Sequence, residues 1–366
     1  MKIISLFNNK GGVGKTTLAY HLSSALADMN HKVLMIDLDS QCNLTLYGIN
    51  ENRLEEIWNE EEEYIKDFDY ARRSLGENNL KKVSSGNRSI HFLLKPTEDG
   101  LSDIDFQCAP IKLKENLYLI PGRLTINQFE FKLSDQWSKT YLGDPFAIRT
   151  ISKIRSIAEQ YGNSLGAEYV IIDTSPNLGI LNKIIISTVD GFLVPAFPDM
   201  FSLYGIQNIG NSLCEWKKEF DTIYRLISDE KRKAFPSSFV GFLGYTIYNA
   251  KKYAGQTRYG LAIAHQGYVD RIPDVIFKYI SQEVRRHLSD EQVRTPIGDT
   301  AVMYTHNTYP SLAQKYKCAI WEIPSCPDLN AEDKITVAPN REKFESIKNN
   351  YVAFADAVIE RIQTLD

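Results

Sequence analysis

The chain has 366 residues, of which 43% are hydrophobic and 24% charged, and its formal net charge at pH 7 is −4. These values are ordinary for a globular protein with a substantial core, and they exclude a strongly basic chain that binds nucleic acid through its overall charge. No run of about 18 apolar residues predicts a transmembrane helix. The N-terminus lacks a signal-peptide pattern and the five cysteines are widely spaced, so we expect reduced thiols, a cytoplasmic location and no membrane contact.

The first forty residues predict a strand, a glycine-rich loop, a helix and a second strand. Residues 2–7 are a short apolar run, and apolar residues recur with helical spacing from Lys15 to Met29. A second apolar strand, residues 33–36, ends in Asp37. This order is a βαβ unit, in which a right-handed crossover joins two parallel strands.

The remaining sequence continues the alternation of strands and helices. We expect strands near residues 116–120, 169–172, 191–195 and 239–247, and helices near 146–161 and 351–366. The pattern predicts an α/β fold with a doubly wound, mostly parallel sheet flanked by helices, organised as a single domain over residues 1–366. Segments at about 50–110 and 265–300 do not follow this pattern and are predicted insertions.

Two charged segments lie outside the predicted sheet. The first predicted insertion contains the acidic run Glu60–Glu63, for which we expect a solvated helix face; a docking surface for a partner is the alternative. The C-terminal helix is expected to pack on the core and to keep Arg361 on its polar side with several acidic residues. A membrane-surface helix should be basic instead.

The loop after the first strand has the composition of a phosphate-binding loop. Glycine lets the backbone approach phosphate oxygens closely, and the backbone amides and the start of the next helix face the anion. A lysine then supplies a charge for the β- and γ-phosphates, and a threonine hydroxyl is placed to bind Mg²⁺. The residues predicted to bind ATP in this loop are Gly11, Gly12, Val13, Gly14, Lys15, Thr16 and Thr17.

Residues 9–17, NKGGVGKTT, resemble the deviant Walker A motif of the ParA/MinD family of P-loop ATPases, most closely the ParA/Soj-type partition ATPases. Asn9 stands where the strict P-loop pattern has glycine. In the family a second lysine, at the place of Lys10, reaches across a dimer interface to the partner's nucleotide. The resemblance therefore implies an ATP-dependent homodimer in which Lys10 and Lys15 are both catalytic.

Carboxylates follow two of the predicted strands and match further motifs of the same family. Residues 33–43 resemble the family's D-x-D-P-Q-x-N motif, with Ser40 in place of the proline. By this resemblance Asp39 orients the attacking water and Asp37 helps to hold the following loop near the metal. Residues 169–176 resemble the Walker B strand, so Asp173 is expected to bind Mg²⁺ together with Thr16 and Asp37. A cap on the next helix is the alternative role for Asp173.

Residues 245–249 resemble the adenine-binding segment of the family. Partition ATPases often have aspartate at the place of Asn249, whereas MinD-like relatives have asparagine, whose amide reads adenine. An amide both donates and accepts hydrogen bonds, which suits the edge of a base. Asn249 is therefore predicted to bind the nucleotide, and a turn-forming role at a strand end is the alternative.

These resemblances imply an ATP hydrolase, weak and stimulated by a partner, that uses ATP and Mg²⁺. Binding of MgATP would drive dimerisation, hydrolysis would reset it, and the cycle would serve plasmid or DNA partition or cargo positioning. An adaptor protein and non-specific DNA are the expected partners; the candidate DNA-binding cations are Lys251, Lys252, Arg258, Arg285 and Arg286. The alternative is a nucleotide-gated protein-interaction switch in a regulatory or defence system without DNA segregation.

Overall fold

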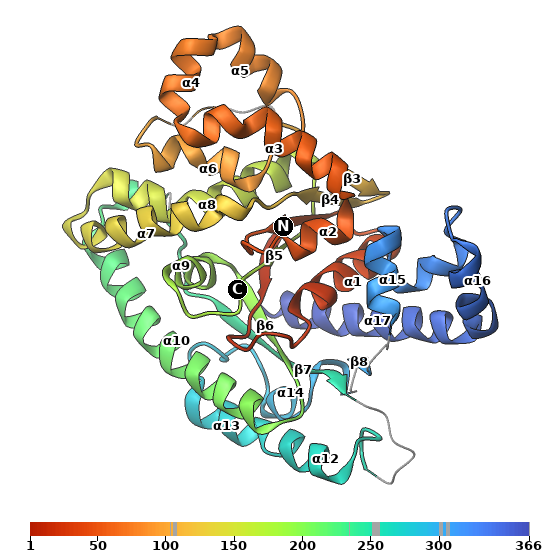
Figure 1. Ribbon diagram of the computed structural model, residues 1–366. Coiled ribbons are helices and arrows are strands. Elements are labelled where there is room, and N and C mark those ends of the chain that lie inside the picture. The colour runs from red at the N-terminus through yellow and green to blue at the C-terminus, as the bar shows by residue number, and fades with distance from the viewer. Residues whose placement is uncertain are drawn as a thin grey trace.

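An eight-stranded sheet forms the centre of the computed structural model, which describes residues 1–102, 104, 108–233, 235–250, 257–299, 303–304 and 308–365 (Figure 1). The strand order is β3-β4-β2-β5-β1-β6-β7-β8. The paired strands are parallel except β3 and β4. The strands are β1 (Lys2–Leu6), β2 (Val33–Asp37), β3 (Ile111–Lys114), β4 (Leu117–Ile120), β5 (Tyr169–Asp173), β6 (Gly191–Ala196), β7 (Gly241–Ala250) and β8 (Met303–Tyr304).

Both faces of the sheet are covered by helices, because successive strand residues point to opposite faces. Ile3 packs into one apolar cluster and Ile4 into the other, and both are buried. Helices of the first cluster include α6 (Ile90–Glu98), α7 (Asn127–Lys139), α8 (Pro145–Leu165), α9 (Ile180–Thr188), α10 (Met200–Leu226), α12 (Ile263–Val269), α13 (Ile272–Tyr279) and α14 (Asp290–Arg294). Those of the second are α1 (Lys15–Asp28), α2 (Asn43–Gly48), α15 (Tyr309–Tyr316), α16 (Ala331–Val337) and α17 (Arg341–Gln363).

This architecture confirms the predicted doubly wound, mostly parallel α/β fold. The predicted strands and helices are present with boundaries shifted by a few residues, and α17 begins ten residues earlier than the predicted C-terminal helix. The sequence analysis did not predict the short strands β3 and β8. Within the part of the chain that the structure describes, no helix is long and apolar enough to cross a lipid bilayer.

A group of four helices fills most of the segment predicted as the first insertion. The group lies beyond the β3–β4 edge of the sheet, at the top of Figure 1, and we call it the α3–α6 arm. Asn50, Asp67 and Ser89 cap its helices α3, α4 and α6 by accepting hydrogen bonds from backbone amides. Besides α6, the arm contains α3 (Glu51–Lys66), α4 (Phe68–Leu75) and α5 (Glu77–Ser84). The second predicted insertion spans α13, α14 and the end of α12.

The acidic run on α3 is only partly solvated. Glu61 is fully buried and accepts hydrogen bonds from the backbone amide and hydroxyl of Ser89. Burial raises the pKa of Glu61 to about 7, although these hydrogen bonds oppose the shift. Its neighbours Glu60 and Glu62 pair with Arg88 and Arg123. The predicted solvated face is therefore wrong for Glu61, because this residue faces the interior of the arm.

The C-terminal helix packs on the core as predicted, but Arg361 does not lie on its solvated side. The Arg361 side chain is buried and donates a hydrogen bond of 3.0 Å to the Leu243 carbonyl. That carbonyl belongs to β7, so α17 is attached to the sheet by a polar contact in addition to its apolar residues.

Candidate nucleotide-binding site

The glycine-rich loop joins β1 to α1 at the carboxyl edge of the sheet. Gly12 and Gly14 have φ angles of 73° and 78°, in the left-handed region that side chains disfavour. A Cβ atom on Gly14 would also lie 1.8 Å from the Tyr248 ring. Gly14 stands at the N-cap of α1 without a side-chain cap, so no side chain competes with an anion for the first amides of the helix.

Lys15 and Thr16 place their polar groups beside the end of β5. Lys15 is buried, and burial lowers the pKa of its amine while Asp173 and Asp39 oppose that shift. The Thr16 hydroxyl donates a hydrogen bond of 2.7 Å to Asp173 Oδ2. The next helix, α9, begins after Gly179 and has no side-chain cap, which removes helix capping as the role of Asp173.

The Asp173 carboxylate fits a divalent cation. The side chain is fully buried, and its Oδ1 atom has no hydrogen-bond partner. Burial raises the pKa of Asp173 to about 8, and the nearby Asp37 charge adds to the shift. Mg²⁺ in phosphate-binding sites commonly takes one or two carboxylates, a hydroxyl and phosphate oxygens. Thr16 and Asp173 are therefore suited to hold it.

Asp39 connects the loops that follow β2 and β5. Its Oδ1 atom accepts hydrogen bonds from the Ser175 hydroxyl at 3.1 Å and from the Gln41 amide at 3.0 Å. Asp39 as a whole is 6% exposed and therefore buried. A carboxylate held in this way can accept a hydrogen bond from water.

Asp37 lies next to Asp173 in the register of β2 and β5, but it is held by its own loop. Its Oδ2 atom accepts hydrogen bonds from the Thr45 amide at 2.8 Å and the Thr45 hydroxyl at 2.7 Å, and Oδ1 accepts one from the Asp39 amide. The geometry gives Asp37 a role in fixing the start of α2. Its predicted role as a metal ligand stays a prediction.

The Lys10 side chain points to the segment that follows β6. Its ammonium forms an ion pair with Asp199 and lies 5.2 Å and 5.6 Å from the ring centres of Phe197 and Phe201. The Lys15 amine lies 3.5 Å from the backbone carbonyl oxygen of Lys10. The two lysines of the loop therefore face different surroundings.

Comparison with known proteins places this loop and sheet in a family. A family model described as an AAA domain matches residues 1–225. Curated relatives include the chromosome partitioning protein ParA of Myxococcus xanthus and the sporulation initiation inhibitor protein Soj of Bacillus subtilis, each 24% identical to the chain. The chain belongs to the ParA-type P-loop ATPases.

These ParA-type relatives match only part of their own length. The Myxococcus protein aligns over 58% of this chain and 58% of its own length, and the Bacillus protein over 60% and 68%. An uncharacterized protein of Methanocaldococcus jannaschii is 30% identical over 60% of this chain and 67% of its own length.

Solved structures share the fold over nearly the whole chain. Protein DIP2308 of Corynebacterium diphtheriae has a TM-score of 0.63 at 22% identity and covers 88% of this chain and 98% of its own. The structure of pNOB8 ParA has a TM-score of 0.59 at 16% identity and covers 99% and 98%. At these identities the likeness concerns the ParA-type fold alone.

Some predicted residues of this ParA-type chain lie outside the described part. Asn249 is on β7, but its side chain is not described, and Lys251 and Lys252 fall in the undescribed residues 251–256. Among the other candidate DNA-binding cations, Arg258 is paired with Asp299 at 2.7 Å. The Arg285 guanidinium lies over the Phe277 ring, 4.7 Å from its centre.

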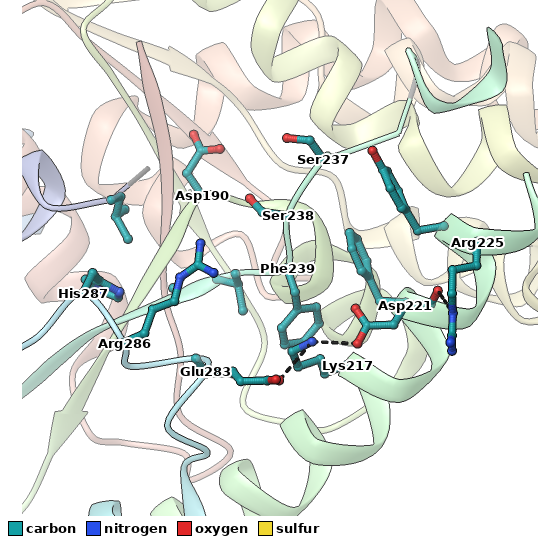
Figure 2. Close-up of a pocket in the computed structure, with 16 residues that line it drawn as sticks. Asp190, Lys217, Asp221, Arg225, Ser237, Ser238, Phe239, Glu283, Arg286 and His287 are labelled. Carbon is teal, nitrogen blue, oxygen red and sulfur yellow. Dashed lines mark hydrogen bonds and ion pairs between the residues drawn. The ribbon is translucent and has the colours of Figure 1, made fainter. Parts of the chain in front are cut away.

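Arg286 lines a cavity of about 580 Å³ at the amino ends of β6 and β7, the opposite edge of the sheet from the glycine-rich loop (Figure 2). Figure 2 shows Lys217 between Asp221 and Glu283, and ion pairs join it to both. Because cations and carboxylates alternate around this cavity, its walls favour neither an anion nor a cation.

Several residues of the site were not predicted. Asp199 holds Lys10, Thr45 holds Asp37, and Tyr248 closes the space above Gly14. Asp199 follows β6 at the same carboxyl edge that led to Asp39 and Asp173, so the strand-end rule for ligand sites could have identified it. Thr45 and Tyr248 carry no comparable signal in the sequence.

Proposed function

We propose that the chain is an ATP-driven switch that dimerises when MgATP is bound and returns to monomers after hydrolysis. The observation that carries this proposal is the meeting of Lys15, Thr16, Asp173 and Asp39 around the start of α1, with a second lysine in the same loop. Phosphoryl transfer needs mainly positioning and charge stabilisation, and these groups are of the types that supply both.

Each residue has a distinct task in the proposed reaction. The amides of the glycine-rich loop and Lys15 hold the phosphates of ATP, and Thr16 with Asp173 holds Mg²⁺. When bound, Mg²⁺ supplies positive charge that offsets the charge of the phosphate oxygens. Asp39 orients the attacking water, and its link to Ser175 keeps the two flanking loops in one arrangement.

The dimer is supported by what surrounds Lys10. The Lys10 side chain is 27% exposed and pairs with Asp199. Phe201, whose ring lies near the Lys10 ammonium, is 63% exposed, and Tyr204 on the same helix is 56% exposed. Exposed aromatic residues are common in protein–protein interfaces. A twofold arrangement would let each chain offer Lys10 to the nucleotide of the other, because a C₂ interface uses the same surface twice.

We propose that this cycle functions in DNA or plasmid partition or in cargo positioning. The named relatives include partitioning proteins, and one structure of the same fold is pNOB8 ParA bound to nonspecific DNA, with a TM-score of 0.53 at 18% identity. Non-specific DNA and a stimulating adaptor protein are the proposed partners. An ATP-dependent shift of random duplex DNA that weakens with salt would support the DNA partner.

Two substitutions in one loop test the switch. Lys15→Ala should weaken ATP binding, by about 100-fold if the lost charge–phosphate contact is worth about 3 kcal/mol. Lys10→Ala should leave ATP binding near wild type while it abolishes turnover and ATP-dependent dimerisation, measured by sedimentation. Full turnover by a Lys10→Ala monomer would rule out the trans role of Lys10.

A nucleotide-gated protein-interaction switch without DNA is the second candidate. It is favoured by the α3–α6 arm, which joins the chain directly after α2 and presents Tyr70 and Leu75 at 68% and 47% exposure. Under this proposal a partner protein binds in the presence of ATP, and Lys15→Ala removes that binding. Random DNA would then give no shift at low salt.

A further inference from the structure

The α3–α6 arm begins where the Asp39 loop ends. Asp39 is followed by three loop residues and then by α2, and only Ile49 and Asn50 separate α2 from α3. The Asn50 side chain accepts a hydrogen bond of 2.8 Å from the Arg53 amide and so caps α3. A displacement of the Asp39 loop would therefore pass through one short helix before it reaches the arm.

A second, non-covalent path joins Asp37 to the arm. Thr45 donates its hydroxyl hydrogen to Asp37 Oδ2 at 2.7 Å, and the same hydroxyl oxygen accepts a hydrogen bond from the Gly122 amide at 2.8 Å. The Gly122 carbonyl then accepts a hydrogen bond from Trp58 Nε1 at 3.1 Å. Asp37 and Thr45 are fully buried, so water does not readily replace the broken contacts.

Gly122 rests directly on Asp37. A Cβ atom at this position would lie 3.1 Å from Asp37 Cγ and 3.0 Å from Cys42 Sγ, closer than ordinary contacts between such atoms. The segment Pro121–Arg123 therefore has no free space between itself and the start of the Asp39 loop. Movement of one requires an adjustment of the other.

The arm holds the same segment from its other side. The Pro121 carbonyl accepts a hydrogen bond of 2.8 Å from the Ile90 amide, at the start of α6. Arg123 donates to the Trp58 carbonyl at 3.0 Å and to Glu62 at 2.5 Å. Two helices of the arm, α3 and α6, are thereby attached to three consecutive residues.

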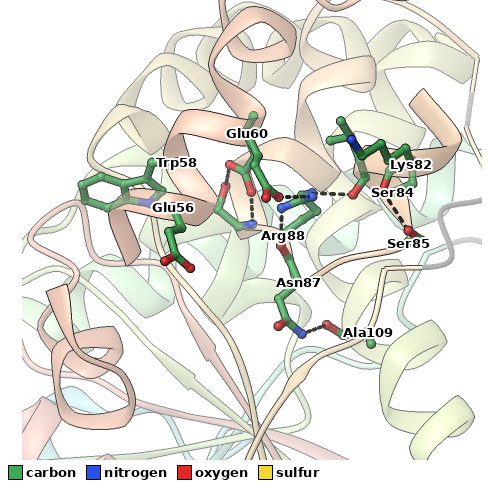
Figure 3. Close-up of polar contacts among 12 residues, drawn as sticks. Glu56, Trp58, Glu60, Lys82, Ser84, Ser85, Asn87, Arg88 and Ala109 are labelled. Carbon is green, nitrogen blue, oxygen red and sulfur yellow. Dashed lines mark hydrogen bonds and ion pairs between the residues drawn. The ribbon is translucent and has the colours of Figure 1, made fainter. Parts of the chain in front are cut away.

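The attachment continues inside the arm through polar contacts. Glu61 on α3 accepts hydrogen bonds from Ser89, the N-cap of α6, and Glu60 pairs with Arg88 (Figure 3). Figure 3 shows Trp58 and Glu60 along α3, with Arg88 beside Glu60. Helices α3 and α6 are thus joined to each other by polar contacts, and Trp58 on α3 contacts Arg123 of the segment that follows β4.

We propose that Trp58 and Arg123 are positioning residues of the nucleotide site, and that the α3–α6 arm becomes more ordered when ATP binds. Through Gly122 and Thr45 they fix Asp37, and through Asp37 the amide of Asp39. Nucleotide contacts at Asp39 and Asp173 stabilise this arrangement, and the arm shares the stabilisation because its attachment is buried and polar. The inference rests on the proposed ATP site, since it assigns a task toward that site.

The test removes hydrogen bonds of the path, one at Trp58 and two at Thr45. Trp58→Phe keeps an aromatic ring and loses the Nε1 donor, and Thr45→Val keeps the side-chain shape and loses the hydroxyl. The matched control is Trp137→Phe, which loses the Nε1 hydrogen bond of 2.6 Å to Glu219 on α10, a contact that is not part of the path through Thr45 and Gly122. Thermal unfolding first verifies that each variant is folded.

Hydrogen–deuterium exchange measures the response of the arm. In the wild type, MgATP should slow exchange in α3 and α6. Trp58→Phe should reduce that protection by about fivefold, the effect of one buried hydrogen bond, and Thr45→Val, which loses two, by about 25-fold. Both variants should lower kcat more than they raise KM. Trp137→Phe should behave as wild type.

The outcomes separate the inference from the proposed function. ATP binding to the wild type with no change of exchange in α3 or α6 overturns the inference alone. Equal protection in Trp58→Phe and Trp137→Phe overturns it as well. A wild-type chain that binds no ATP overturns the proposed function and the inference together.

Discussion

Replacing Asp199 with asparagine removes the charge that faces Lys10 and leaves the shape of the side chain in place. Asp199 Oδ1 accepts a hydrogen bond of 2.8 Å from the Ser202 amide and so caps α10, while Oδ2 faces Lys10. Asparagine is an equally good N-cap residue. Asp199→Asn therefore removes the ion pair with Lys10 and should have little effect on the stability of α10.

The magnitude follows from the exposure of the pair. Both side chains are about a quarter exposed, 27% for Lys10 and 25% for Asp199. An ion pair of such intermediate exposure stabilises the conformation that it holds by on the order of 1 kcal/mol. If each chain must release Lys10 before it serves the partner's nucleotide, two releases cost about 2 kcal/mol. Asp199→Asn should then tighten the ATP-bound dimer about 30-fold.

Sedimentation of the ATP-bound chain over a range of concentrations measures this change. Asp229→Asn is a matched control, because it removes one carboxylate from the pair with Arg232 on α11 (Asp229–Arg232), a pair that does not involve Lys10. Asp199→Asn should have no effect in a Lys10→Ala background. A dimer that is unchanged or weaker in Asp199→Asn alone would refute the idea that Asp199 restrains Lys10.

Two further predictions concern stability. Gly14→Ala should lower the free energy of unfolding by about 3 kcal/mol, because the new Cβ atom clashes with the Tyr248 ring and the φ angle is strained. Gly12→Ala has the φ strain but open space around the new Cβ atom, so it should lower the free energy of unfolding by only about 1 kcal/mol. Similar urea midpoints for the two variants would contradict this prediction. Burial raises the pKa of Glu61 to about 7 in the folded chain. The folded state therefore favours the protonated carboxyl, and the free energy of unfolding of the wild type, measured relative to Glu61→Gln, should be greatest below the pKa of the unfolded chain. It should fall by about 3 kcal/mol as the pH rises from about 4.5 to 8. Urea unfolding of both proteins at these pH values measures the change, and a pH-independent difference would show that folding does not raise the pKa of Glu61.

The parts of the site that the sequence predicts are those set by local geometry. Lys15 and Thr16 follow from the loop between a strand and a helix, and Asp39 and Asp173 from the rule that parallel strands end at one edge. The contacts of Thr45 with Gly122, 77 residues away, and of Gly14 with Tyr248 depend on the folded arrangement. No local pattern reports such pairs.

The burial of Glu61 could have been predicted from the sequence. It lies four residues after Ile57 and four before Ile65, so all three share one face of α3, and all three are buried. The solvated face was predicted from the charge of the four consecutive glutamates and not from their positions on the helix. A helix periodicity applied to the acidic residues themselves would have placed one of them inside.

Two polar contacts, Thr45 with Gly122 and Asp199 with Lys10, lie on opposite sides of β1, the strand that precedes the glycine-rich loop. In the sheet order, β2 and β4 stand on one side of β1 and support Thr45 and Gly122, while β6 stands on the other and leads to Asp199. No described contact joins Asp199 to Gly122 or to Trp58. Sites without shared partners usually act independently. One nucleotide could therefore change two separate surfaces, the α3–α6 arm and the start of α10, and a partner on one need not compete with a second chain on the other.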